Sequence, residues 1–197
     1  KEPASSLIAR AQAGGAYVSL AHPGWYTMTT SEALLVSAAD AVEIYNYSCV
    51  LSSARGNGIM IADFLLNEGH KISFTATDDS HFHLPDFAGG WVMVAAPDLS
   101  QSAIIAALKA GHHYSSTGAD FNDISIDKGI LTVQTTPVQS IVLSGEGHMA
   151  SACHGNNITV ARFDLSEFAS QWFRITARSF SNQMAWSNPY FKNDLGL

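Results

Sequence analysis

The sequence lacks long apolar runs, a cluster of basic residues and a cysteine framework, and each absence excludes a class of protein. No run of about 18 uninterrupted apolar residues occurs, so no membrane-spanning helix is predicted. The formal net charge is −7 without a Lys/Arg cluster, which argues against nucleic-acid and anionic-membrane partners, because both require a basic surface. Cys49 and Cys153 lack C-x-x-C spacing, so we predict reduced thiols rather than a disulfide framework or a zinc knuckle.

What the sequence contains is typical of a folded globular protein. Of 197 residues, 47% are hydrophobic and 14% are charged, which is enough for one core or for a core and a small satellite domain. Residues 1–6 lack the apolar stretch of a signal peptide, and we expect a soluble, cytoplasmic protein. The chain also opens inside an expected helix, so it reads as a sequence that starts within a domain.

The pattern of the chain changes near residue 120. Helices alternate with short apolar strands up to Gly118, whereas short β-rich runs separated by Gly, Asn and Ser follow Asp120. We therefore expect an α/β protein with two domains, residues 1–119 and residues 120–197.

Strand-helix units of this length predict parallel strands joined by crossover helices, as in part of an α/β barrel or an open sheet. The expected strands of the first domain are residues 16–21, 41–45, 71–77 and 91–95, and the expected helices are 5–13, 31–39 (capped by Ser31), 60–67 and 100–111. In the second domain, strands are expected at 123–127, 130–135, 140–143, 157–164 and 172–179. Their alternation of polar and apolar residues predicts a small antiparallel, sandwich-like domain with one exposed face.

Residue types that bind metals follow two of the expected strands. His22 comes directly after the first strand, and Pro23 is expected to hold it in an extended conformation. Asp79 and His81 follow the third strand two residues apart, so their side chains share one side if the backbone stays extended. Zinc, manganese and iron all accept imidazole nitrogen and carboxylate oxygen, and three protein ligands with an open position suit a hydrolytic site.

Other interpretations of these residues remain open. A strand-end histidine is often a hydrogen-bonded structural residue. Asp78 and Asp79 also suit a turn or a helix N-cap, because Asp accepts hydrogen bonds from free backbone N–H groups. A nucleophilic triad of Asp79, Ser80 and His81 is disfavoured, because a triad needs converging side chains and neighbouring residues usually diverge.

Five stretches in register, and a closing stretch that resembles the end of a β-domain found on some members, make the chain similar along nearly its whole length to the polymerase and histidinol phosphatase (PHP) family of metal-dependent phosphoesterases. They are residues 21–25 (AHPGW), 42–46 (VEIYN), 77–81 (TDDSH), 107–111 (ALKAG), 114–118 (YSSTG) and 184–189 (MAWSNP). The resemblance implies part of a distorted seven-stranded β/α barrel whose mouth holds two or three metal ions, followed by a small β-domain. It also implies that His22, Asp79 and His81 are three of the metal ligands.

The chain departs from the family pattern at its start. The family's first motif, a His-x-His, and its further ligands are expected upstream of residue 1. The only such spacing here, His81-Phe82-His83, belongs to a later motif. The resemblance therefore implies the C-terminal part of such a protein, with about half of the barrel and less than half of the metal site.

By the same resemblance, the reaction is hydrolysis of a phosphate ester of a small molecule through metal-activated water, with zinc, manganese or iron as the cofactor. Arg55, His112 and His113 are candidates for contacts to the phosphate. Glu43, Asn46 and Asp78 are candidates for residues that hydrogen-bond to the metal ligands and orient them. His148, Cys153 and His154 are expected in loops.

Two alternatives belong to other classes of protein. One is a binding module in which the partial site holds an ion or a phosphate without turnover. The other is a structural half-barrel that pairs with another chain through an open strand edge, for example as a homo-oligomer.

Overall fold

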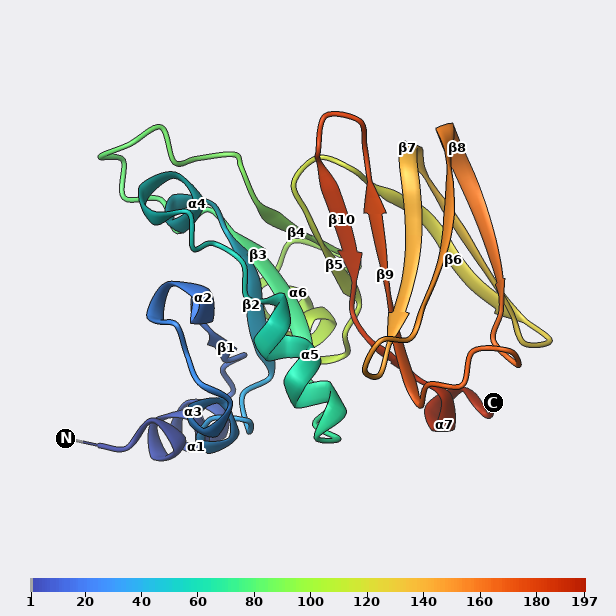
Figure 1. Cartoon of the computed structure of the whole chain (residues 1–197). Helices are drawn as coiled ribbons and strands as arrows, with labels where there is room; N and C mark the ends of the chain where they lie inside the picture. Colours follow the sequence, from blue (N-terminus) through green and yellow to red (C-terminus); the bar gives the residue numbers. More distant parts are fainter. Residues whose placement is uncertain (1) are drawn as a thin grey trace. The chain divides into compact units, whose positions relative to one another are not determined.

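A computed structural model of the chain describes residues 2–197 and shows a mixed α/β protein with seven helices in that range (Figure 1). The chain divides into two compact units, the first ending at Ser115 and the second running Ser116–Leu197. No helix within residues 2–197 combines the length and the apolar character needed to cross a membrane. The α/β class predicted from the sequence is therefore confirmed.

The first unit alternates helices with short strands. Its helices are α1 (Ala4–Ala13), α2 (Pro23–Tyr26), α3 (Thr30–Leu35), α4 (Tyr47–Ser53), α5 (Ile59–Asn67) and α6 (Gln101–Lys109). Its strands are β1 (Ser19–Leu20), β2 (Ala41–Asn46), β3 (Ser73–Thr77), β4 (Trp91–Val94) and β5 (His113–Ser116).

Three of these strands form a parallel sheet in the order β1-β2-β3. The register pairs Ala41 of β2 with Ser19 on one side and with Ser73 on the other. The central strand is buried on both faces, as parallel sheets require, and α5 packs against it. The predicted parallel arrangement is confirmed for these three strands, whose carboxyl ends lie at one edge of the sheet, whereas β4, the fourth expected strand, is not part of this sheet.

Local rules explain most element boundaries and also correct some predictions. The helix expected to be capped by Ser31 is capped two residues earlier, because Thr29 forms a capping box with Glu32, and it ends at Leu35 rather than near residue 39. The helices α2 and α4 were not predicted, since each is only four to seven residues long. The first strand is two residues long rather than the six expected.

The second unit is an antiparallel curled sheet. Its elements are β6 (Phe121–Asp127), β7 (Ile130–Gly145), β8 (Ala150–Asp164), β9 (Trp172–Arg178), β10 (Met184–Ser187), β11 (Tyr190–Phe191) and α7 (Lys192–Leu195). The long strand β7 pairs with β8 along its length, with β6 through its first half and with β9 through its second half.

The two strands expected at residues 130–135 and 140–143 are therefore one strand, interrupted by bulges near Val138. The expected alternation holds on β7, where Leu131 and Val133 are fully buried while Gln134 is exposed. The strands of this unit belong to one hydrogen-bonded sheet, and a sandwich of two facing sheets is not confirmed.

Candidate functional site

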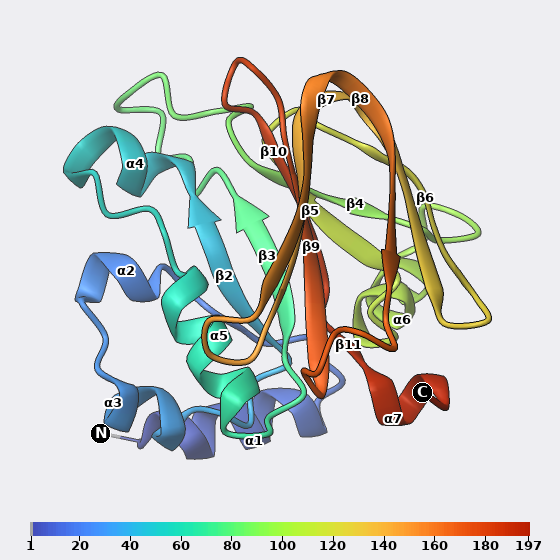
Figure 2. The same cartoon turned by 45° about the vertical axis from the view of Figure 1, so that its right-hand side comes forward.

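Four polar side chains meet at the carboxyl edge of the parallel sheet. His22 follows β1, Glu43 and Asn46 lie on β2, and Asp79 follows β3. Figure 2 shows β2 and β3 running in the same direction, with α4 beyond the end of β2. The parallel strands thus bring together residues up to 57 positions apart, from His22 to Asp79. The sequence predicted that side chains at the carboxyl ends of these strands would be neighbours.

Glu43 connects all three strand ends. One carboxylate oxygen, Oε2, accepts a hydrogen bond from the backbone N–H of His22 at 2.5 Å and another from the Asn46 amide at 2.9 Å. The other oxygen accepts a hydrogen bond from the hydroxyl of Thr77. The side chain is only 6% exposed, so three donors compensate the burial of its charge.

Asn46 links the two carboxylates of the cluster. Its Nδ2 donates to Glu43 Oε2 and, at 3.1 Å, to Asp79 Oδ2. Its Oδ1 accepts from the backbone N–H of Cys49 at 2.8 Å and so caps α4. Because Asn46 is fully buried and all of these bonds are made, its amide orientation is determined by its neighbours.

The side chains of His22 and Asp79 face each other at this edge of the sheet. The distance from His22 Nε2 to Asp79 Oδ2 is 3.9 Å. Ligand bonds of about 2.0–2.2 Å in a tetrahedral site place two ligand atoms about 3.4 Å apart, so a shared ion requires His22 and Asp79 to move about half an ångström closer. The second ring nitrogen, His22 Nδ1, is buried without a hydrogen-bond partner in residues 2–197. Imidazole nitrogen and carboxylate oxygen are ligand types that zinc, manganese and iron accept, and an ion at this pair stays a prediction.

The backbone at these two residues differs from the extended form expected from the sequence. His22 has φ 31° and ψ 57°, and Asp79 has φ 50°, so both lie in the left-handed region. The expectation that Pro23 keeps His22 extended is wrong, because α2 starts at Pro23 and turns the chain at once. Such backbone conformations cost about 1–3 kcal/mol each for residues other than glycine and gather at functional sites.

Two other carboxylates hold the loop that follows β3. Asp78 accepts backbone hydrogen bonds at 2.6–2.9 Å from three consecutive residues, Ala88, Gly89 and Gly90. Asp78 therefore closes the loop and, unlike Asp79, does not bond to Asn46 or Glu43 in the described contacts.

Asp86 fastens the middle of the same loop. It is 1% exposed and accepts hydrogen bonds from the Ser80 hydroxyl and from the backbone N–H of His81 and Phe82. These bonds, led by that of His81, lower the pKa of Asp86 to about 2, against a smaller opposing effect of burial. The segment that carries His81 is thus anchored by an ionised carboxylate.

The imidazole of His81 is exposed and has no hydrogen-bond or ion-pair partner in the described chain. No group of three or more His, Cys, Asp or Glu side chains arranged for a metal ion occurs within residues 2–197. The structure brings His22 and Asp79 together, and the role of His81 stays a prediction.

The predicted phosphate contacts differ in exposure. Arg55 is exposed, and its guanidinium has no partner among the described residues. His112 is exposed, whereas His113 on β5 is buried and its Nε2 lies 3.1 Å from the carbonyl oxygen of Phe74. Burial lowers the pKa of His113, with a smaller contribution from His112 and an opposing one from the Phe74 hydrogen bond.

A glycine loop packs directly on β2 beneath the cluster. A Cβ on Gly58 would lie 2.2 Å from the carbonyl oxygen of Glu43, and one on Gly56 would lie 2.4 Å from that of Asn46. Only glycine permits this approach. The loop also brings the carbonyl oxygen of Arg55 within 3.0 Å of a Cβ placed on Gly24 of α2.

Sequence reasoning did not find two features of the site. Thr77 ends β3 and donates to Glu43, which the alternation of β3 alone does not indicate. Trp25 and Tyr26 form a ring cluster with His22, with centroids 5.3 Å and 4.9 Å from the imidazole. The aromatic cluster could have been predicted, because two aromatic residues directly follow His22-Pro23-Gly24 in the sequence.

The chain was compared with protein families, curated proteins and solved structures. No protein-family model, curated protein or solved structure matches the chain. Function is therefore inferred from the geometry around His22 and Asp79 and from the resemblance of the sequence to the PHP family.

Proposed function

We propose that this chain is the C-terminal part of a PHP-type metal-dependent phosphoesterase and that His22 and Asp79, together with His81, hold a divalent ion. The observation that supports this most directly is the 3.9 Å approach of His22 Nε2 to Asp79 Oδ2. The chemistry that a zinc, manganese or iron ion supplies in such a site is neutralisation of phosphoryl charge and activation of water.

The surrounding residues prepare this site for a cation. Asp79 faces the imidazole of His22 and Glu43 accepts from the backbone N–H of the same residue, and no Lys or Arg side chain of the described residues pairs with either carboxylate. Asn46 fixes the Asp79 carboxylate, and Glu43 fixes the backbone of His22. Such partners behind the ligands orient them and limit the reorganisation needed on binding.

Arg55 is the best candidate for a contact to the phosphate of the substrate. Its backbone lies beside α2, which begins one residue after His22, and its guanidinium is exposed and unpaired in the described part of the chain. A guanidinium donates two parallel hydrogen bonds to phosphate oxygens. We place the phosphate of a small ester between Arg55 and the His22–Asp79 pair.

Under this proposal, the sheet β1-β2-β3 with its helices is part of a distorted β/α barrel, and the second unit corresponds to the small sandwich-like domain of some family members. The parallel order of the three strands supports the first assignment. The second assignment is supported by antiparallel pairing of β6 with β7, of β7 with β9 and of β9 with β10.

Metal content provides the test. Purified protein is loaded with zinc or manganese, dialysed and measured by elemental analysis, with hydrolysis of a generic phosphate ester assayed in parallel. Wild type and the control His148→Ala, an exposed histidine of the second unit, are expected to retain metal. His22→Ala and Asp79→Ala are each expected to lose the metal, together with whatever hydrolysis wild type shows, while circular dichroism stays unchanged.

Equal metal content in His22→Ala, Asp79→Ala and wild type would overturn the proposal. So would a wild type that binds neither metal and hydrolyses no ester.

A second candidate function is that of a half-barrel that pairs with another chain. Among the described strands β1 pairs with β2 alone, so its other edge is open. An open parallel edge is a template for a further strand. Sedimentation over a range of concentrations distinguishes the two, because a pairing function requires a dimer at micromolar concentration and the phosphoesterase does not.

A further inference from the structure

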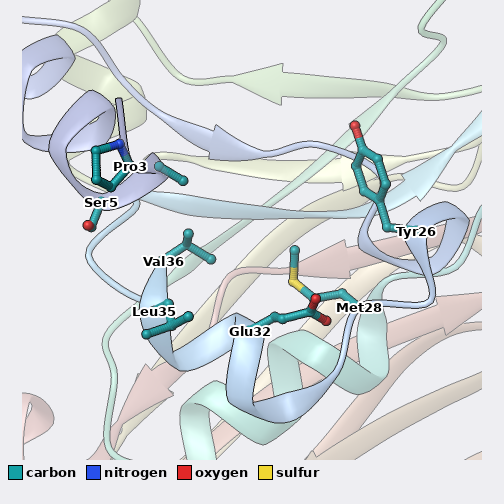
Figure 3. Close-up of a pocket in the computed structure, with 8 residues that line it drawn as sticks. Pro3, Ser5, Tyr26, Met28, Glu32, Leu35 and Val36 are labelled. Atoms are coloured by element: carbon teal, nitrogen blue, oxygen red, sulfur yellow. The ribbon is translucent and has the colours of Figure 1, made fainter. Parts of the chain in front are cut away.

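A pocket of about 530 Å³ lies beside the candidate site, within the first unit (Figure 3). It is formed by the start of α1, by α3 and by the segment around α2. Its lining residues are Pro3, Ala4, Ser5, Tyr26, Met28, Glu32, Leu35 and Val36. The volume is within the range of about 300–1,000 Å³ that is usual for sites of small organic molecules.

Tyr26 connects this pocket to the proposed metal site. Its ring lines the pocket, and its centroid lies 4.9 Å from that of the His22 imidazole. It is also 58% exposed, so a molecule in the pocket can reach it. A ligand that occupies the pocket would therefore contact Tyr26, whose ring is in turn next to the imidazole of His22.

The lining favours an apolar group over an anionic one. Met28, Leu35 and Val36 provide apolar surface, and Leu35 is 72% exposed although it is an aliphatic side chain. Among the lining residues within 2–197, Glu32 alone is charged. Hydrogen bonds from the backbone and the hydroxyl of Thr29 lower the pKa of Glu32, so its carboxylate stays ionised at neutral pH.

These features give a substrate a defined orientation. A phosphate in the pocket would be repelled by the Glu32 carboxylate, whereas an aromatic or aliphatic group would cover exposed apolar surface. The exposed rings of Trp25 and Tyr26 add faces on which a flat group can stack.

We propose that this pocket binds the apolar organic group of the phosphate ester, preferably one with an aromatic ring, while the phosphate points to His22 and Asp79. The proposal rests on the proposed phosphoesterase function of the same site. It assigns the substrate class as phosphomonoesters of apolar alcohols.

The test compares two esters whose alcohols have similar acidity, 3-phenylpropyl phosphate and propyl phosphate, on the full chain loaded with manganese. Because only the phenyl ring differs, kcat should be similar, and KM should be about tenfold or more lower for the phenyl ester. Binding of 3-phenylpropanol is measured separately by calorimetry, which does not depend on hydrolysis.

Paired variants locate the effect. Ser5→Trp introduces a bulky ring into the pocket and is expected to abolish both the KM difference and the binding of 3-phenylpropanol. Ser6→Trp, the neighbouring exposed residue of α1 that does not line the pocket, should retain both. Leu35→Ala should weaken binding of the alcohol at least threefold, and Leu34→Ala, outside the lining, should not.

The outcomes separate the two proposals. Hydrolysis of both esters with equal KM and without binding of 3-phenylpropanol would overturn the pocket assignment and leave the phosphoesterase standing. Saturable binding of the alcohol that is lost in Ser5→Trp, without binding of manganese and without hydrolysis of either ester, would support the pocket and reject the phosphoesterase. Equal effects of Ser5→Trp and Ser6→Trp would also overturn the pocket assignment.

Discussion

Asn46 Nδ2 lies 3.1 Å from Asp79 Oδ2, although 33 residues separate the two in sequence. The same nitrogen donates to Glu43, so one buried amide keeps two carboxylates at hydrogen-bond distance from a neutral donor. Without that donor, two like charges would be adjacent in a poorly solvated place.

Replacement of Asn46 by Asp should therefore destabilise the protein. The change keeps the shape but replaces the shared donor by a third acceptor, so the free energy of unfolding should fall by about 1–3 kcal/mol. Urea denaturation at pH 7 measures it. Asn122→Asp, at an exposed position of β6, is the matched control and should change stability by less than about 0.5 kcal/mol. Equal losses in both variants would show that the Asn46 bonds contribute nothing specific.

Gly58→Ala should also destabilise the protein, for a steric reason. The new Cβ would lie 2.2 Å from the carbonyl oxygen of Glu43, so the loop must move away from β2. We expect a loss of about 2 kcal/mol in the free energy of unfolding. Gly14→Ala is the control, because its Cβ meets no atom closer than 3.3 Å and its φ is −79°. A Gly58→Ala protein as stable as that control would refute the close packing of the loop on β2.

Asp86→Ala should release the loop that carries His81. The substitution removes the acceptor of the Ser80, His81 and Phe82 hydrogen bonds. Limited digestion with chymotrypsin should then cut at the exposed Phe82 or Phe87 at least fivefold faster than in wild type. Asp98→Ala, which removes an exposed carboxylate before α6, should leave that cleavage unchanged.

The pH dependence of the same cleavage follows from the lowered pKa of Asp86, which is about 2 against a usual 3.8. A carboxyl group with a depressed pKa stabilises the folded loop above pH 3.8 and loses this effect as the pH falls towards 2. Resistance to an acid protease such as pepsin should therefore persist at pH 4 and decline below it. A decline already complete at pH 5 would contradict the assignment.

His113 should make stability depend on pH near neutrality. Burial lowers its pKa below the ordinary value of 6.5, so the unfolded chain binds a proton more readily than the folded one. Stability should be constant above about pH 7 and fall as the pH drops through 6.5 towards 5. His113→Gln, which cannot titrate, should flatten this part of the profile, and the exposed His148→Gln should not. Identical profiles for wild type and His113→Gln would exclude His113 as the cause.

The sequence by itself determined the class of fold and identified the strand ends that carry the candidate site. Short apolar strands such as residues 41–46 and 73–77 alternate with helices, and this alternation is typical of parallel strands with crossover helices, so the α/β class followed from the order of the elements. Because parallel strands end at one edge, His22, Glu43 and Asp79 were identified as neighbours before any distance was known.

Only the tertiary structure decided how these residues meet. The left-handed backbone of His22 and Asp79, and the bonds of Asn46 to both Glu43 and Asp79, depend on contacts between segments that local propensities do not contain. For the same reason, the sequence divided β7 into two strands: a bulge looks like a break in the alternation, whereas pairing with β8 carries the strand through it. Local pattern determines which element forms, and long-range packing determines the conformation of the residues at its end.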